Sequence, residues 1–284
     1  MKSVALISKP DKPELNTIVP ALVEWLRQRH YTVYPDVETA AYLAGEPSIP
    51  RDRIGERSPQ FAIVLGGDGT LLSAARALSG QGIPLLAVNL GSLGFLTEVT
   101  LPELYPTLEV IDCGDCPTEA RAMVHCQLQR AGSCLAQYEA LNDVAITRTA
   151  ISRLISLDLY LEEMFVSSYK GDGLILSTPT GSTAYSLASG GPILTPSVSG
   201  FVLTPVCSHS LTHRPLVVRD TALIEVVCRS IEPEAFLSVD GQVGMPVIQG
   251  DRVVCRKSQY EVKLLHMRKA FFEVLRAKLK WGQR

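Results

Sequence analysis

The 284-residue sequence has no strong excess of charge of either sign, because Lys and Arg number 27, Asp and Glu number 29, and the formal net charge is −2. Without a basic excess there is no broad positive field, so neither nucleic acid nor a membrane surface is an expected partner. A long apolar run is also missing at the start, where "MKSVALISKPDK" is interrupted by Pro10 and Asp11. This stretch is too short for a signal peptide core or a membrane span, and we expect a cytoplasmic protein.

Several motifs of common enzyme classes are absent. The sequence contains no GxxxxGK[ST] phosphate loop, no GxGxxG fingerprint and no GxSxG nucleophile elbow. The seven cysteines are an odd number and indicate reduced thiols rather than a disulfide framework. Part of a zinc site is suggested by Cys113, Cys116, His125 and Cys126, but no second CxxC or HxxxH pair follows at finger spacing. We therefore favour a Cys-containing turn before a strand and predict no metal ligands.

What is present is a chain that is 46% hydrophobic and long enough for about two domains. The runs "FAIVL" and "IPLLAV" are continuously apolar, as in parallel strands covered on both faces. After "DCGDCP" at 112–117 the pattern changes to period two, which indicates antiparallel strands. Strands are expected at 122–128, 155–161, 222–228, 235–239, 252–256 and 260–265.

The fold class predicted from these patterns is an α/β N-terminal domain followed by an all-β, sandwich-like C-terminal domain. The boundaries are placed at 1–115 for the first domain and 116–265 for the second. Residues 266–284 return to helical spacing, so we expect a C-terminal helix that packs back on the first domain.

Glycines surround a single acid in "IVLGGDGTLL" at 63–72, directly after an expected buried strand and before an expected helix. Open α/β sheets bind ligands at this end of a strand, and glycines let the backbone approach a phosphate closely. Phosphate would repel Asp68 unless the carboxylate met a metal ion or a hydroxyl proton, as in phosphoryl transfer to an alcohol. The alternative is that Asp68 is a helix N-cap. Candidates for the phosphate-facing loop are Gly66, Gly67, Gly69 and Thr70.

Hydroxyl and small residues crowd "YKGDGLILSTPTGSTAYSLASGGP" at 169–192, where Tyr185 offers a flat face for a base. This composition suits a dinucleotide or a sugar, although an ordinary Ser/Thr/Gly loop is the alternative. Asn142 and Asp143 in "LND" could bind ribose hydroxyls or could cap a strand. "SVDGQ" at 238–242 is interpreted as a hairpin turn, because Asp-Gly is a preferred two-residue connection.

Taken in order, "GGDGT", "NLGSLGFL", "LND", "YKGDGL" and "TPTGSTAYSLASGGP" resemble the NAD kinase family, of bacterial ATP-NAD kinase type, over residues 61–242. The resemblance implies transfer of the ATP γ-phosphate to the adenosine ribose 2′-hydroxyl of NAD. It also implies Mg²⁺ or another divalent cation with ATP, and a homo-oligomer, either a dimer or a tetramer.

Carried over by position, Asp68 accepts or orients the proton of the 2′-hydroxyl, and Asp172 is reached in part from a neighbouring subunit. The sequence departs from the family where Asp143 replaces a common Glu, Lys170 an Arg, and Ala188 a frequent Ser. The NAD-binding residues implied by the resemblance are Asp68, Gly69, Leu72, Phe95, Asn142, Asp143, Lys170, Asp172, Thr180, Thr183, Ala184 and Tyr185.

Two other functions remain open at this point. Another kinase with a GGDGT motif, acting on a lipid or a sugar alcohol, would have no use for the "TPTGSTAY" stretch. A dinucleotide sensor without catalytic activity would have no use for Asp68.

Overall fold

The computed structural model describes residues 2–91, 94–114, 117–149, 153–230, 235–265 and 271–281. The chain forms two compact units. Unit 1 consists of Met1–Ala120 and Val262–Arg284, and unit 2 of Arg121–Glu261. The domain boundaries drawn from the sequence stay a prediction, whereas the predicted fold class, α/β and then β-rich with a C-terminal helix, is confirmed by the two units.

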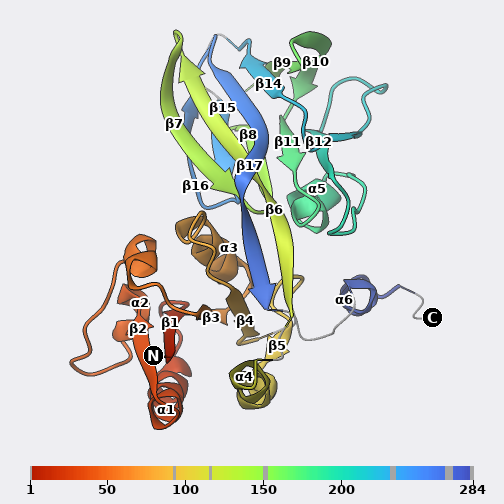
Figure 1. Ribbon diagram of the computed structural model, residues 1–284. Helices are drawn as coiled ribbons and strands as arrows, with labels where there is room; N and C mark the ends of the chain where they lie inside the picture. The colour runs from red at the N-terminus through yellow and green to blue at the C-terminus, as the bar shows by residue number, and fades with distance from the viewer. Residues whose placement is uncertain are drawn as a thin grey trace. The chain divides into compact units, whose positions relative to one another are not determined.

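Unit 1 is built on a parallel sheet in the order β4-β3-β1-β2, with the short β5 beside β4 (Figure 1). Every residue of β3 and β4 is buried, which explains why these strands are continuously apolar in sequence. The strands are β1 (Lys2–Ser8), β2 (Tyr31–Pro35), β3 (Phe61–Gly66), β4 (Leu85–Asn89) and β5 (Val99–Thr100).

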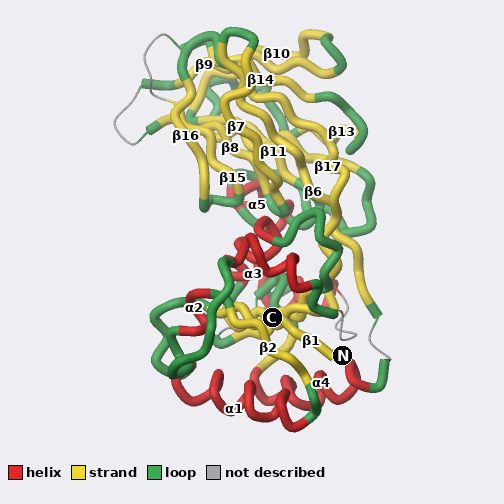
Figure 2. Tube along the Cα trace, turned by 60° about the vertical axis from the view of Figure 1, so that its left-hand side comes forward, coloured by secondary structure: helices red, strands yellow, loops and turns green. Residues whose placement is uncertain are grey.

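Helices cover both faces of this sheet (Figure 2). Helices α1 and α4 share one core cluster with Leu6 and Ile63 of the sheet, and α3 buries Leu71 and Ala75 on the other face. Unit 1 contains α1 (Leu15–Gln28), α2 (Val37–Ala40), η1 (Arg51–Arg57), α3 (Asp68–Ala77), η2 (Leu101–Glu103), α4 (Leu104–Asp112) and α6 (Phe271–Leu279).

The C-terminal helix α6 is part of unit 1, as predicted. It buries Val274 and Leu275, and the Nζ atom of Lys278 lies 5.9 Å from the ring centroid of Phe95. Residues 266–270, which the sequence assigned to the same helix, lie outside the described residues. The described part of α6 therefore packs beside the loop that carries Phe95.

Unit 2 contains a six-stranded antiparallel sheet in the order β13-β12-β11-β8-β15-β16. A second antiparallel layer includes β10-β9-β14-β17, with β6 paired to β17 and β7. One core cluster takes Val144 and Leu203 from the first layer and Leu157 and Val226 from the second, so the unit is sandwich-like as predicted.

The strands of the six-stranded sheet are β8 (Asp143–Arg148), β11 (Gly173–Ser177), β12 (Gly200–Val206), β13 (Leu216–Arg219), β15 (Ala235–Val239) and β16 (Val243–Val247). Those of the second layer are β6 (Thr118–Arg130), β7 (Ser133–Ala140), β9 (Ile155–Leu161), β10 (Met164–Gly171), β14 (Ile224–Cys228) and β17 (Arg252–Leu265). Two short helical turns, η3 (Gly181–Thr183) and α5 (Tyr185–Ala188), follow β11.

The expectation of two strands at 252–256 and 260–265 is wrong, because β17 is continuous over Arg252–Leu265. Buried positions continue through the polar middle of the strand, but their alternation shifts by one residue between Cys255 and Ser258, so Ser258 is buried among polar neighbours. No helix in the described part of the chain has both the length and the apolar character needed to cross a membrane.

Candidate active site

Asp68 is the first residue of α3, directly after the carboxyl end of β3. Gly67 is the N-cap, and no side chain caps this helix, so the alternative interpretation of Asp68 as the N-cap is wrong. The Asp68 carboxylate instead accepts hydrogen bonds from the segment 95–97. It therefore links the GGDGT loop to the loop that follows β4.

The two oxygens of Asp68 are used unequally. Oδ1 accepts from the backbone N–H groups of Leu96 at 3.1 Å and Thr97 at 3.2 Å, and from the Thr97 hydroxyl at 3.1 Å. Oδ2 accepts only the N–H of Phe95, at 2.9 Å, among the described residues. Because each carboxylate oxygen can accept about two hydrogen bonds, Oδ2 retains capacity for one more donor.

Close packing around Asp68 depends on glycine at one position. A Cβ atom on Gly94 would lie 2.1 Å from Oδ1 of Asp68 and 2.3 Å from Oγ1 of Thr97. Asn89, at the end of β4, donates to the same Thr97 hydroxyl at 3.0 Å. The position of the Asp68 carboxylate is thus determined by contacts on several sides.

The predicted phosphate-facing glycines have different surroundings. A Cβ on Gly66 would lie 2.3 Å from Oγ1 of Thr70, whereas a Cβ on Gly67 would meet no heavy atom of the described residues within 4 Å. The φ angle of Gly67 is −103°, which other residues adopt readily. Packing within the described chain therefore explains glycine at 66 and does not explain it at 67.

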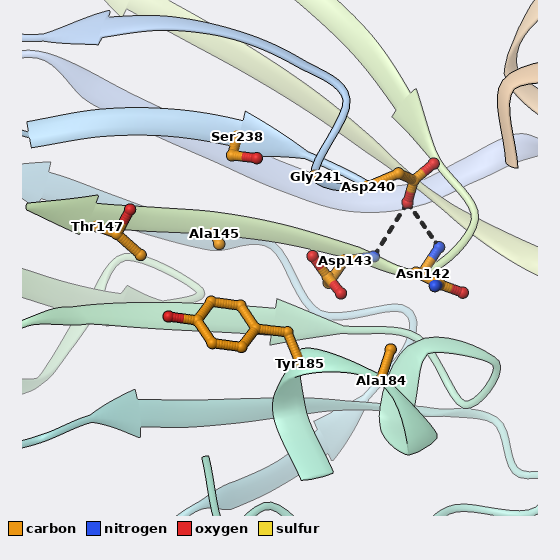
Figure 3. Close-up of a pocket in the computed structure, with 9 residues that line it drawn as sticks. All are labelled: Asn142, Asp143, Ala145, Thr147, Ala184, Tyr185, Ser238, Asp240 and Gly241. Atoms are coloured by element: carbon orange, nitrogen blue, oxygen red, sulfur yellow. Dashed lines mark hydrogen bonds between the residues drawn. The ribbon is translucent and has the colours of Figure 1, made fainter. Parts of the chain in front are cut away.

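Unit 2 contains a pocket of about 330 Å³ at the ends of β8 and β15 (Figure 3). Four of the predicted NAD-binding residues line it: Asn142, Asp143, Ala184 and Tyr185. Five further residues line it that no sequence motif assigned to a binding site: Ala145, Thr147, Ser238, Asp240 and Gly241.

The pocket is rich in hydrogen-bond acceptors. The side-chain oxygen Oδ1 of Asn142 is buried and has no hydrogen-bond partner among the described residues. Asp143 and Asp240 add two buried carboxyl groups, 6% and 7% exposed. A buried acceptor without a donor is costly, so this pocket favours a ligand that brings hydroxyl groups.

Tyr185 supplies an apolar surface beside these acceptors. Its side chain is 43% exposed and lies along the pocket in Figure 3. Burial raises the pKa of its hydroxyl, with smaller contributions from nearby Cys207, Asp172 and Asp143. The ring therefore stays neutral and offers a face on which a planar group can stack.

The hydroxyl-rich segment after β11 holds the chain beneath the pocket. The Thr178 hydroxyl donates to the carbonyl of Leu141 at 2.6 Å, and the Thr178 N–H donates to the carbonyl of Asn142 at 2.9 Å. A Cβ on Gly181 would lie 2.1 Å from the same Asn142 carbonyl oxygen. These residues position Asn142 and do not line the pocket themselves.

Other predicted NAD-binding residues lie elsewhere in the two units. Thr180 and Thr183 are buried and interact with each other, Thr183 donating to the Thr180 carbonyl at 3.3 Å. Lys170 is exposed on β10, while Asp172 accepts from Nε of Arg148 at 2.6 Å. None of these four lines the pocket of Figure 3. In unit 1, Leu72 is buried within α3.

The candidate zinc ligands do not converge in the part of the chain that the structure describes. Cys126 points into the core of unit 2, and its neighbour His125 lies on the opposite face of β6, paired with Glu139 at 2.7 Å. Cys116 lies outside the described residues. Among those described, no group of three or more His, Cys, Asp or Glu side chains could hold a metal ion.

Burial raises the pKa of Asp143 from 3.8 to about 7, with a smaller contribution from the negative charge of Asp240. Below pH 7 the folded state then retains a proton that the unfolded chain releases near pH 4. The free energy of unfolding consequently decreases as the pH rises through this window, by about 4 kcal/mol in all. Above pH 7 the Asp143 carboxyl is ionised in both the folded and the unfolded state, so it no longer changes the free energy of unfolding with pH.

We predict that Asp143→Asn removes the loss of folding stability that Asp143 causes as the pH rises from about 4 to about 7. We compare the free energy of unfolding of the variant with that of the unsubstituted protein at the same pH. The difference, variant minus unsubstituted protein, should be about 2 to 3 kcal/mol higher at pH 8 than at pH 5, which means that the variant gains relative stability as the pH rises. Urea unfolding followed by circular dichroism at both pH values measures the difference. The same relative stability at the two pH values would contradict an elevated pKa for Asp143.

Comparisons with known proteins place the chain in a family. A model of the ATP-NAD kinase N-terminal domain matches residues 4–115, and one of the ATP-NAD kinase C-terminal domain matches residues 141–267. The NAD kinase of Koribacter versatilis is 57% identical over 284 residues and covers 100% of both chains. The NAD kinase of Solibacter usitatus is 47% identical over 285 residues, covering 100% of this chain and 99% of the relative.

Among solved structures, yeast NADH kinase complexed with NADH matches with a TM-score of 0.88 and 26% identity, covering 100% of this chain and 89% of that one. The two family models together match well over half of the sequence, in the order that the motifs predicted. The chain therefore belongs to the ATP-NAD kinase family, whose members phosphorylate NAD to NADP.

Proposed function

We propose that the protein transfers the γ-phosphate of ATP to the 2′-hydroxyl of the adenosine ribose of NAD, with Asp68 as the general base. The observation that carries this proposal is the acceptor-rich pocket of unit 2. The amide oxygen of Asn142, which has no hydrogen-bond partner among the described residues, and the carboxyl of Asp143 match the two hydroxyl donors of a ribose. The exposed Tyr185 ring suits the adjoining base.

In the proposed binding mode, Asn142 and Asp143 accept hydrogen bonds from ribose hydroxyls. Asp143 stands where the family commonly has Glu, so its shorter side chain must approach the ribose more closely or bind it through water. The further residues that we assign to NAD binding, following the family resemblance, are Asp68, Gly69, Leu72, Phe95, Lys170, Asp172, Thr180, Thr183, Ala184 and Tyr185.

Asp68 is proposed to act through Oδ2. This oxygen accepts the proton of the 2′-hydroxyl while the hydroxyl oxygen forms a bond to the γ-phosphorus. The bond between that phosphorus and the oxygen bridging to the β-phosphate breaks, and ADP leaves. The three donors on Oδ1 support this role, because they hold the carboxylate in one orientation and leave Oδ2 with room for the substrate.

We propose that Gly66, Gly67, Gly69 and Thr70 face the phosphates of ATP. The N-terminus of α3 adds N–H groups and a partial positive charge there. Mg²⁺ or another divalent cation is treated as part of the ATP substrate, where it neutralises phosphate charge. Its ligands are then mainly phosphate oxygens and water.

The two competing functions have less support. A lipid or sugar-alcohol kinase does not account for the match to the ATP-NAD kinase C-terminal domain over residues 141–267. A sensor without catalytic activity does not account for the anchored Asp68 carboxylate with capacity left on Oδ2. Formation of NADP from NAD and ATP would separate the proposed function from both.

We predict that Asp68→Asn lowers the rate of NADP formation by at least about 10²-fold and changes NAD affinity only a few-fold. The amide oxygen of Asn can take the place of Oδ1, where it keeps three of the four hydrogen bonds, while the amide nitrogen at Oδ2 cannot accept a proton. NADP formed with ATP and Mg²⁺ is detected with an NADP-specific dehydrogenase, and NAD affinity is measured by calorimetry.

Thr97→Val is the matched control for Asp68→Asn. It removes one donor from the carboxylate and leaves the proposed base in place, so its rate should decrease far less than that of Asp68→Asn. Equal rates in the unsubstituted protein and Asp68→Asn would exclude Asp68 as the base.

Gly66→Ala and Gly67→Ala should separate packing from phosphate binding. We expect Gly66→Ala to lower the melting temperature, because its methyl group would overlap Thr70. Gly67→Ala should keep the melting temperature within about 2 °C and raise the KM for ATP about tenfold or more, because its methyl group would enter the space for phosphate. Unchanged kinetics of Gly67→Ala would remove Gly67 from the phosphate site.

We also propose that the chain forms a homo-oligomer, a dimer or a tetramer, in which Asp172 contributes to the site of a neighbouring subunit. This proposal follows from the family resemblance. Light scattering at the assay concentration should give a mass of two or four times 30.9 kDa. A mass of one chain would contradict it.

A further inference from the structure

The hairpin between β15 and β16 places a carboxylate where a turn does not need one. Asp240 and Gly241 have φ angles of 51° and 65°, and the N–H of Gln242 donates to the carbonyl of Val239 at 3.0 Å. These features confirm the two-residue turn predicted from "SVDGQ" and agree with type I′ geometry. Asn adopts this conformation at least as readily as Asp, so the turn itself does not explain the negative charge.

The Asp240 carboxylate binds the backbone of the loop between β7 and β8. Oδ1 accepts the N–H groups of Asn142 at 2.7 Å and Asp143 at 3.2 Å, which Figure 3 shows as dashed lines. Oδ2 accepts the N–H of Leu141 at 3.2 Å. The backbone N–H of Asp240 in turn donates to the carbonyl of Asp143 at 2.9 Å.

This arrangement holds three consecutive N–H groups with one side chain. A carboxylate can accept all three at once and forms stronger hydrogen bonds to N–H groups than a neutral oxygen does. An amide side chain in its place would turn an N–H₂ group toward one or two of these donors. The negative charge therefore serves the loop at 141–143 rather than the turn at 239–242.

The loop that Asp240 holds carries the two proposed ribose acceptors. Asn142 and Asp143 line the pocket, and the backbone around them is bound by Asp240 on one side and by Thr178 on the other. The ionisable groups that face Asp143 in this pocket are Asp240 and Tyr185. Because Asp240 is negatively charged and close, it also affects the proton on Asp143.

We propose that Asp240 is a positioning residue that holds Asn142 and Asp143 in place to receive the ribose hydroxyls of NAD. This inference rests on the proposed function. Asp240 itself does not need to touch the substrate, since its oxygens are engaged by the backbone of residues 141–143. Its effect on NAD binding is exerted through the loop and through the charge next to Asp143.

Asp240→Asn is the test variant, because Asn maintains the turn and removes the charge. We expect the Kd for NAD, measured by calorimetry, to rise about tenfold to a hundredfold. We also expect faster hydrogen exchange at the amides of Leu141, Asn142 and Asp143, with the KM for ATP within about twofold. Unchanged exchange, or faster exchange with an unchanged Kd, would overturn the proposal.

The matched control is Asp251→Asn in the turn between β16 and β17. The Asp251 carboxylate is also buried and accepts a backbone N–H, that of Ile248 at 2.9 Å, together with the guanidinium of Arg130. Asp251→Asn should lower the free energy of unfolding, and it should leave the Kd for NAD unchanged at temperatures where the variant is folded. A comparable increase in Kd for both variants would mean that Asp240 acts only through general stability.

The pH dependence provides a readout that a purely structural role would not change. Asp143 binds hydroxyl donors best when ionised, so NAD affinity of the unsubstituted protein should weaken below pH 7. Removing the charge of Asp240 relieves repulsion on Asp143, and the weakening should begin at a lower pH in Asp240→Asn. An unshifted profile would overturn the electrostatic part of the proposal.

The outcomes also separate this inference from the proposed function. If the unsubstituted protein binds NAD and forms no NADP, phosphoryl transfer is the claim that fails, and the comparison of Kd values still tests Asp240. If NADP is formed and Asp240→Asn behaves like the unsubstituted protein in Kd, exchange and pH profile, the positioning role fails alone.

Discussion

In each unit the candidate site residues depend on one carboxylate that accepts backbone N–H groups from a loop, half-buried for Asp68 and buried for Asp240. In unit 1, Asp68 accepts from Phe95, Leu96 and Thr97, and in unit 2, Asp240 accepts from Leu141, Asn142 and Asp143. Loops have no repetitive backbone hydrogen bonding of their own, so their N–H groups need acceptors. A carboxylate supplies up to about four acceptor positions from one short side chain, and it fixes a loop more tightly than a hydroxyl could.

The same interaction determines the electrostatic character of the pocket. Burial raises the pKa of Asp143 to about 7, and the negative charge of Asp240 makes a smaller contribution in the same direction. Asn142 Oδ1 remains buried without a donor among the described residues. A pocket that keeps acceptors unpaired in the free protein gives up some stability, and it recovers that free energy only when a ligand with hydroxyl groups binds.

Much of this could be predicted from residues that act locally. The buried runs of β3 and β4 and the DG turn at 240–241 each follow from short-range rules of periodicity or backbone conformation. The break predicted inside β17 was wrong because a stretch of polar residues interrupts the apolar alternation in the sequence, whereas the strand continues through it and buries Ser258. Asp240 was interpreted as a turn residue only, because its second role involves a loop that lies 97 to 99 residues away in the chain.

The sequence by itself determined the class of each half of the chain and the identity of the loops that carry the chemistry, since periodicity, glycine spacing and motif order depend on neighbouring residues. Only the tertiary structure decided which acceptor atoms can still take a hydrogen bond from a ligand. Oδ2 of Asp68 has room for one more donor because, among the described residues, it accepts only the N–H of Phe95. Asn142 Oδ1 has no partner in the described part of the chain, where Asp240 and Thr178 bind the backbone around it and not its side chain. The hydrogen bonds that an atom makes depend on which groups the fold brings next to it, and local sequence patterns do not identify partners that are far away in the chain.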